Sequence, residues 1–413
     1  MKPIADLTMT DSEALRDLFA TYRRLRDQDP VHRDPVTGAI VLTRYEHIRQ
    51  VIADPATFSN KTGQLGIARE CPAKPLLDRM FGERGFPLVA TAIDNDPPEH
   101  RKMRSLFDTA FGPKRVNDIK PRIQSLVDEL LDALGGRTSM EVMQELAMPV
   151  PTRIIAEQLG LPPENIVDFK RWSDAMMLSS DPRCTTEEMV QYAGQIIEMQ
   201  QFIARAAHAA QESPRDDVVS DVANASIDGR PASMGEIVWT LQNVLIAGNE
   251  STTSGIGSMI RLLIESGLEA TLRGDPAAIP KFVEESLRIA SPLQTFYRRT
   301  TTATHVGGCP ITRDQILELR YGAANCDERR YAEPDRVNLE RSELKSHLAF
   351  GYGVHYCPGN LLARAEMRTV LERLLARFRN FRLAPGDQSY ERTINVSVCG
   401  PARLAIEFDR IAH

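Results

Sequence analysis

Apolar residues recur at steps of three and four along most of this chain, the spacing typical of amphipathic helices. The pattern predicts helices over about 12–28, 45–53 and 94–104, and a further series over about 114–212 with breaks at 135–136, 160–163 and 180–182. Alternation predicts a strand over 39–42 and a terminal hairpin from 393–398 and 404–408. The stretch 59–89 has no periodic pattern and is predicted to be a long loop.

The longest apolar stretch lies between Ile237 and Ile260, where Glu250 is the only charged residue. A helix of this length rises about 36 Å at about 1.5 Å per residue, so it can cross a whole domain. A helix that is apolar on nearly every side must be buried, and a lone carboxylate in it is costly unless it is paired, hydrated or functional. Three polar side chains argue against a membrane span: Gln242, Asn243 and Asn249. We predict a mainly α protein with a long central helix and a small β-rich region at about 30–60.

A short glycine-bearing segment near the C-terminal end leads into another helix. Gly351 and Gly353 permit a tight backbone path, and Cys357 follows, directly before a proline whose fixed φ suits the first turn of a helix. Apolar residues at helical spacing then continue over about 363–378. Cys357 is therefore expected at a helix N-terminus, which lowers a thiol pKa and favours the thiolate that haem iron requires. The alternative for a lone cysteine is a buried structural thiol.

Charge and cysteine usage narrow the class of protein. A formal charge of −6 and a pI near 5.9 argue against a nucleic-acid-binding protein. The N-terminus has no signal pattern, and no segment reaches about 18 uninterrupted apolar residues, so we expect a cytoplasmic protein without a membrane anchor. The six cysteines are scattered, which predicts neither a disulfide framework nor a metal finger: Cys71, Cys184, Cys309, Cys326, Cys357 and Cys399.

The segment around Cys357 carries six positions of a known pattern: Phe350, Gly351, Gly353, His355, Cys357 and Gly359. This pattern resembles the haem-binding loop of the cytochrome P450 family, and further segments resemble motifs of that family in the same order along the chain. The resemblance implies the P450 fold as a single domain over residues 1–413, although length alone suggests two or three domains. It also implies haem b (iron protoporphyrin IX), contacted by this loop, with Cys357 as the axial ligand of the iron.

Two segments resemble the family's elements that hold the haem propionates. Residues 97–104 match Pro-Pro-x-His-x-x-x-Arg, which implies that His100 and Arg104 bind a propionate; such a pair is otherwise a solvated helix start. Arg298 corresponds to the family's second propionate-binding arginine, with Arg299 as its rival, and His355 is expected to join the set.

The middle of the apolar helix resembles the segment that crosses the distal face of the haem. The resemblance implies that Ala247 and Gly248 contact the haem. It also implies that Glu250 and Ser251 form the acid–alcohol pair of oxygen activation, although the family usually has threonine where this chain has Ser251. Thr252 could supply the hydroxyl instead if the helix is locally bulged.

A further resemblance concerns structure rather than chemistry. Glu285 and Arg288 match the family's Glu-x-x-Arg element, which a downstream arginine completes as a buried network, and Arg336 is the candidate for that arginine. Cys326 stands where the family's Asn-Arg-Asp segment has arginine.

The resemblance implies a haem-thiolate monooxygenase that activates dioxygen and oxidises a small-to-medium apolar substrate. No flavin, nicotinamide or iron–sulfur motif occurs in the chain, so electrons are expected from a ferredoxin and its reductase. Four basic residues are candidates for meeting the donor's acidic surface, with solvated helix charge as the alternative: Arg101, Lys102, Lys114 and Arg115. A peroxide-driven peroxygenase and a non-catalytic haem sensor or carrier remain alternatives; the sensor has no need of Glu250 and Ser251.

Overall fold

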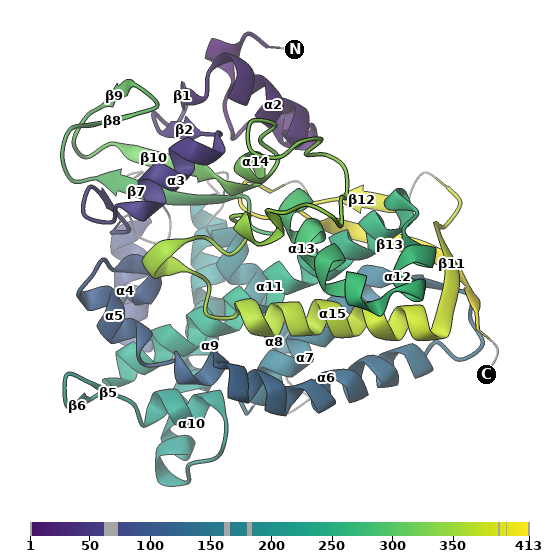
Figure 1. Ribbon diagram of the computed structural model, residues 1–413. Coiled ribbons are helices and arrows are strands. Elements are labelled where there is room, and N and C mark those ends of the chain that lie inside the picture. The colour runs from purple at the N-terminus through teal and green to yellow at the C-terminus, as the bar shows by residue number, and fades with distance from the viewer. Residues whose placement is uncertain are drawn as a thin grey trace.

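Among the described residues helices predominate, and the strands form two small sheets and two hairpins (Figure 1). The computed structural model describes residues 2–61, 73–160, 166–179, 184–386, 389–393 and 395–411. The helices are α1 (Ser12–Arg16), α2 (Leu18–Gln28), α3 (Tyr45–Ala53), α4 (Lys74–Arg84), α5 (Glu99–Arg104), α6 (Pro113–Asp132), α7 (Pro149–Gln158), α8 (Ile166–Ser179), α9 (Thr186–Glu212), α10 (Val218–Ala223), α11 (Met234–Ser266), α12 (Glu269–Gly274), α13 (Ile279–Ile289), α14 (Tyr321–Asn325) and α15 (Asn360–Arg377). The strands are β1 (Val31–Arg33), β2 (Ile40–Leu42), β3 (Phe58–Ser59), β4 (Ser139–Glu141), β5 (Ser226–Ile227), β6 (Arg230–Pro231), β7 (Thr295–Thr300), β8 (Thr304–Val306), β9 (Cys309–Ile311), β10 (Ile316–Arg320), β11 (Phe378–Leu383), β12 (Tyr390–Arg392) and β13 (Pro401–Arg410).

The central helix is confirmed and is longer than the pattern predicted, because α11 begins at Met234 and ends at Ser266. Ser233 caps it by accepting a hydrogen bond from the backbone N–H of Glu236, and Gly267 ends it in the left-handed conformation (φ 65°). The helix packs against α7, α9, α13 and α15, and twenty of its residues are buried. Among the described residues, no helix is long and apolar enough to cross a bilayer.

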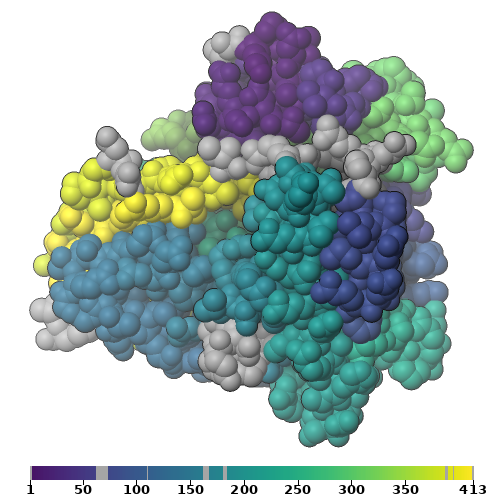
Figure 2. All heavy atoms as spheres, turned by 180° about the vertical axis from the view of Figure 1, so that it is seen from behind, coloured from purple at the N-terminus to yellow at the C-terminus, as the bar shows by residue number. Residues whose placement is uncertain are grey.

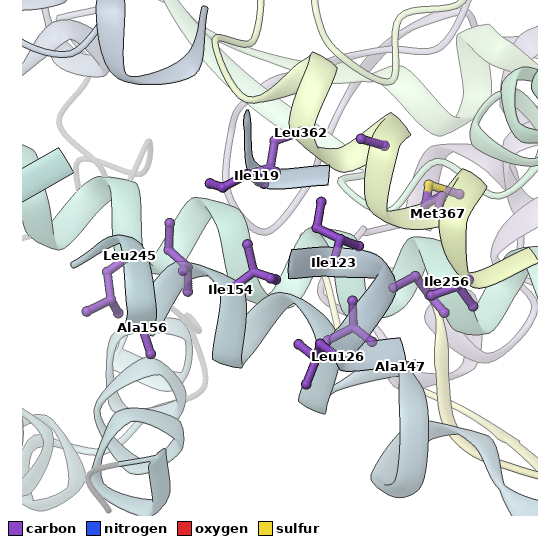
Figure 3. Packing of buried hydrophobic residues seen from close by; sticks show 14 of the residues in the cluster. Ile119, Ile123, Leu126, Ala147, Ile154, Ala156, Leu245, Ile256, Leu362 and Met367 are labelled. Atoms are coloured by element: carbon purple, nitrogen blue, oxygen red, sulfur yellow. The ribbon is translucent and has the colours of Figure 1, made fainter. Parts of the chain in front are cut away.

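The main hydrophobic core lies between α11 and the helices around it. Figure 3 shows how side chains from four helices meet there: Ile119, Ile123 and Leu126 of α6, Ile154 of α7, Leu245 and Ile256 of α11, and Leu362 and Met367 of α15. A Cβ on Gly255 of α11 would lie 3.3 Å from the sulfur of Met367, so the absence of a side chain lets the two helices approach closely. This packing holds α15, and with it the loop that carries Cys357, against the central helix.

The small β-rich region is assembled from two distant parts of the chain. One sheet has the strand order β1-β2-β10-β7-β3, so β7 and β10 lie between strands from the predicted region at 30–60. β10 is parallel to β2 and antiparallel to β7. The second sheet has the order β11-β13-β12, with β4 also paired to β13. The strand predicted over 393–398 is wrong: β13 pairs instead with β12, and the described residues of 393–398 lie outside the strands apart from a bridge between Val398 and Leu293.

The long loop predicted over 59–89 contains a helix, α4. None of the residues of α4 is buried, so it lacks the apolar stripe by which a surface helix is found in a sequence. Figure 2 shows α4 beside α9 on the back of the molecule, in agreement with their contacts. Three sequence features lie outside the described residues: Cys71 and the breaks at 161–163 and 180–182.

The buried ion-pair network at Glu285 contains a different arginine from the one predicted. Glu285 and Arg288 are fully buried, and the guanidinium of Arg288 donates to the carboxylate at 2.7 and 3.0 Å. Arg341, not Arg336, completes the network, since its Nε lies 3.1 Å from Glu285. The Arg336 side chain is 77% exposed and pairs with Glu333, and only its backbone carbonyl accepts from Arg288. Two arginines five residues apart cannot be distinguished by spacing alone.

We expect Arg341→Ala to destabilise the protein by about 3–5 kcal/mol, because it leaves part of the Glu285 carboxylate buried without its partner. The matched control, Arg336→Ala, should stay within about 0.5 kcal/mol of the unchanged protein, because it removes only an exposed ion pair. Urea-induced unfolding measures both. Equal midpoints for the two variants would contradict the assignment.

Candidate functional site

The Cys357 loop takes a tight backbone path that depends on two glycines. Gly351 and Gly353 both have positive φ (70° and 71°), a region that glycine occupies without steric cost. The backbone N–H of Cys357 donates to the carbonyl of Phe350 at 2.9 Å and closes the loop. α15 then begins at Asn360, with Gly359 as its N-cap residue. The sequence placed Cys357 correctly, immediately before this helix.

The environment of the Cys357 sulfur differs from the prediction in its net electrostatic effect. Desolvation raises the pKa of the thiol above its ordinary value, although the backbone N–H of Gly359 and the charges of Arg104 and Arg364 oppose the shift. The helix N-terminus therefore lowers the pKa as expected, but burial is the larger effect. A thiolate at this position needs a positive partner such as a metal ion, which is the chemistry of a ligand rather than of a free nucleophile.

Two histidines meet at this loop: His100 is buried, and His355, within the loop, is half-buried. The rings of His100 (α5) and His355 are in edge contact, with centroids 4.4 Å apart. The Nε2 atom of each is buried without a hydrogen-bond partner among the described residues. Asn60 lies close, its Nδ2 3.4 Å from Nδ1 of His355. An amide N–H donates, so His355 accepts at Nδ1 and presents an N–H at Nε2.

Two arginines complete the cluster. Arg298, on β7, is 4% exposed and forms no salt bridge with a carboxylate among the described residues; its Nη1 donates to the carbonyl of Tyr297 at 2.7 Å. Burial, followed by the charges of Arg298, His100 and Arg104, lowers the pKa of His355 to about 3. Arg104 donates to the carbonyl of Tyr356 at 2.9 Å and to Asp108 at 2.6 Å, so it is tied to the Cys357 loop. Orphaned N–H groups and a buried cation suit an anionic ligand such as a carboxylate.

On the central helix, Ala247 and Ser251 lie on one face, whereas Asn249 and Thr252 lie on other faces. Ala247 is exposed although it lies in the middle of the largely buried central helix, and the hydroxyl of Ser251 donates to its carbonyl at 2.7 Å. Gly248 is partly buried; a Cβ there would make only ordinary contact with Ile155. The backbone is α-helical throughout α11, so Thr252, which is buried, points about 100° away from Ser251.

Glu250 is not isolated, because it has a partner on α8. Its Oε1 lies 3.6 Å from Nζ of Lys170, which also bonds to Asp174. Burial raises the pKa of Glu250, and the Lys170 charge opposes the shift while Asp174 adds to it. Lys170 was not predicted from the sequence as a partner of Glu250. A lone carboxylate in an apolar helix signals that some partner exists, but not which residue supplies it.

Comparison with known proteins identifies the class of molecule that this site belongs to. A family profile for cytochrome P450 matches residues 278–404. The chain is 31% identical to cytochrome P450 107B1 of Saccharopolyspora erythraea over 412 residues, which cover 98% of each chain. The chain therefore belongs to the cytochrome P450 family. It is a P450 monooxygenase with a haem-thiolate cofactor, and its reaction takes dioxygen, an organic substrate and redox partners.

Other relatives are named for the reactions they catalyse. The chain is 33% identical to erythromycin C-12 hydroxylase of Saccharopolyspora erythraea over 373 residues (90% of this chain, 88% of the relative). It is 31% identical to the steroid C26-monooxygenase of Mycobacterium tuberculosis over 386 residues (93% and 92%). Among solved structures, cytochrome P450 CYP109Q5 from Chondromyces apiculatus is 31% identical, with a TM-score of 0.86 over the full length of both chains. The predicted fold class, mainly α with a long central helix and a small β-rich region, is thereby confirmed.

Proposed function

We propose that this chain is a cytoplasmic haem b monooxygenase that hydroxylates or otherwise oxidises a small-to-medium apolar substrate, with electrons from a ferredoxin and its reductase. One observation carries the proposal most directly. Beside Cys357, His100 and His355 each bury an Nε2 atom that has no partner among the described residues, and the nearby Arg298 is a buried cation without a carboxylate partner there. That arrangement suits a large cofactor that carries carboxylates and is ligated through sulfur.

In this proposal Cys357 would bind the haem iron through its sulfur, and the groups around it would hold the cofactor. Bound through a thiolate, haem supplies dioxygen activation, because the sulfur favours O–O cleavage. Phe350, Gly351 and Gly359 would contact the cofactor from the Cys357 loop. Ala247 and Gly248 would contact it from α11, where small side chains leave room for a flat ring system.

The propionates are assigned to His100, Arg104, Arg298 and His355. Support comes from the buried Nε2 atoms of the two histidines and from the guanidinium of Arg298, which lacks a carboxylate partner among the described residues. Burial lowers the pKa of both imidazoles, which favours the neutral form with one N–H, and the positive charge comes from the arginines.

Glu250 and Ser251 are assigned to proton delivery. Ser251 shares its face with the exposed Ala247, so its hydroxyl can turn from the Ala247 carbonyl toward a bound molecule. Glu250 points toward Lys170 on the outer side of α11, with its side chain 25% exposed. A carboxyl with a raised pKa between solvent and the hydroxyl can take up a proton and pass it inward through waters.

An external electron donor is supported by the surface around the Cys357 loop. Four of its large apolar side chains are between 37% and 44% exposed: Tyr352, Val354, Tyr356 and Leu361. Of the basic residues considered for docking, Lys102 pairs with Asp228 at 2.8 Å and Arg115 with Asp221 at 2.7 Å. Arg101 and Lys114 remain exposed and could meet an acidic partner.

The apolar substrate rests on the relatives' names, which include a macrolide hydroxylase and a steroid monooxygenase. A peroxide-driven peroxygenase is the second candidate. Retention of both the acid and the hydroxyl on α11 favours the dioxygen route, because peroxide already carries the protons that this pair delivers.

We expect Cys357→His to move the Soret band of the reduced carbon-monoxide complex from the far-red thiolate position to a globin-like position, because nitrogen replaces sulfur on the iron. Cys309→Ser, at an exposed cysteine in β9, is the control and should leave the spectrum unchanged. An unaltered spectrum in Cys357→His would refute the ligand assignment.

We expect Arg298→Gln or Arg104→Gln to weaken haem retention, and the double variant to purify mostly as apoprotein. Each charged hydrogen bond contributes about 1.5–3 kcal/mol, or roughly 10- to 150-fold in affinity. Haem content and the rate of haem transfer to an acceptor protein measure the effect. Arg299→Gln, the neighbouring position on β7, is the control. Full haem content in the double variant would place the propionate contacts elsewhere.

We expect Ser251→Ala to keep consuming reduced cofactor but to divert it to peroxide, because the hydroxyl that directs protons is lost. Glu250→Gln should slow consumption itself, because it removes the proton source. Thr252→Ala should have a smaller effect on coupling than Ser251→Ala, because Thr252 points away from the Ala247 face. Product formed per cofactor consumed, with a surrogate ferredoxin pair, measures all three.

Unchanged coupling in both hydroxyl variants would show that the acid–alcohol mechanism is not used. Equal product formation when peroxide replaces the ferredoxin pair would favour the peroxygenase.

A further inference from the structure

We infer that Glu284, on α13, is a positioning residue for the Cys357 loop, and that with Arg364 it sets the electrostatic potential at the sulfur. The inference rests on the proposed role of Cys357 as the iron ligand. Glu284 lies 73 positions before Cys357 in the chain, beside the Glu285 of the ion-pair network, and no motif of the sequence singled it out.

Glu284 is 7% exposed, and its carboxylate receives three hydrogen bonds. Arg364 of α15 binds it with both prongs of the guanidinium, Nε at 2.6 Å and Nη2 at 3.0 Å. Nε2 of His347 lies 3.0 Å from Oε2. Because Nδ1 of His347 accepts from the backbone N–H of Ala349 at 3.2 Å, the ring is the neutral tautomer with its proton on Nε2. Arg364 therefore provides the positive charge that balances Glu284.

Arg364 connects Glu284 to the Cys357 loop through two contacts. Its guanidinium lies over the ring of Phe350, with Cζ 4.3 Å from the centroid, and the carbonyl of Phe350 accepts the N–H of Cys357. Its Nη1 donates to Oδ1 of Asn360 at 2.9 Å, and Nδ2 of Asn360 donates to the carbonyl of Cys357 at 2.8 Å. The backbone on both sides of the peptide unit at Cys357 is thus fixed through a single guanidinium, which Glu284 orients.

The charges of the pair act on the sulfur unequally. Arg364 contacts Phe350 and Asn360, both of which hydrogen-bond to the backbone of Cys357, whereas the hydrogen bonds of Glu284 are to Arg364 and His347. Burial alone would raise the pKa of Glu284, but the hydrogen bonds from His347 and Arg364 outweigh it and hold that pKa at about 2, so the carboxylate is ionised throughout the working range. Groups that hydrogen-bond to or surround a ligand tune the potential of its metal, and a nearer positive charge favours the reduced state.

The test is the ferric/ferrous reduction potential of three variants in the haem-loaded protein. Glu284→Gln leaves the Arg364 charge unbalanced and should raise the potential. Arg364→Gln removes the nearer positive charge and should lower it. The double variant should lie between the two. Glu372→Gln, which removes an exposed ion pair with Arg368 on the same helix, is the control and should match the unchanged protein.

A second measurement distinguishes the effect of Arg364 on the position of the loop from the effect of its charge. Arg364→Lys keeps the charge but loses the two-pronged bond and the planar contact with Phe350, so its potential should stay closer to that of the unchanged protein than the potential of Arg364→Gln does. The fraction of its carbon-monoxide complex with the far-red thiolate band should fall. This comparison also decides the matter if Glu284→Gln fails to retain haem.

Shifts in the same direction for Glu284→Gln and Arg364→Gln would overturn the inference, as would Arg364 variants that match the Glu372→Gln control in both measurements. The carbon-monoxide spectrum of the unchanged protein tests the proposed haem-thiolate site by itself. Failure of that site and failure of the Glu284 inference are therefore distinguishable.

Discussion

The burial of positive and hydrogen-bonding groups around Cys357 is the constraint on which the site depends. Arg298 is held at 4% exposure without a carboxylate partner among the described residues, and His100 and His355 each bury an unpaired Nε2. Orphaned groups of this kind cost about 1–3 kcal/mol each, and more when they are charged. The rest of the fold has to offset that cost, and it does so through the packing of α11 against α7, α9, α13 and α15.

Several buried charges elsewhere in the core have partners within the protein. Glu285 is held by Arg288 and Arg341, Glu284 by Arg364, and Glu250 lies near Lys170. This contrast distinguishes charged groups with a structural role from charged and polar groups with a functional role. Networks closed within the chain fix the position of the backbone, whereas groups left open beside Cys357 suit a cofactor. Glu250 stands between the two cases, because its single partner is distant at 3.6 Å and its pKa is raised by burial.

Two ion-pair networks on α13, one at Glu284 and one at Glu285, contact different parts of the chain around the Cys357 loop. Glu285 ties α13 to the segment around Arg341 and to the backbone N–H of Asn338, while its neighbour Glu284 reaches α15 and the loop itself. Successive residues on a helix point about 100° apart, so adjacent carboxylates can serve separate partners. α13 thereby supports both the chain segment before the Cys357 loop and α15, the helix after the loop.

The sequence by itself determined the family, the central helix and the location of Cys357, because these depend on local features: helical periodicity, two glycines at positive φ and a proline after the cysteine. The tertiary structure alone decided which arginine completes the Glu285 network, which lysine faces Glu250 and how β7 and β10 join the N-terminal strands. It also revealed α4, a helix without a buried stripe. Such pairings join residues far apart in the chain, and spacing along a sequence carries no information about them until the packing of the core has brought them together.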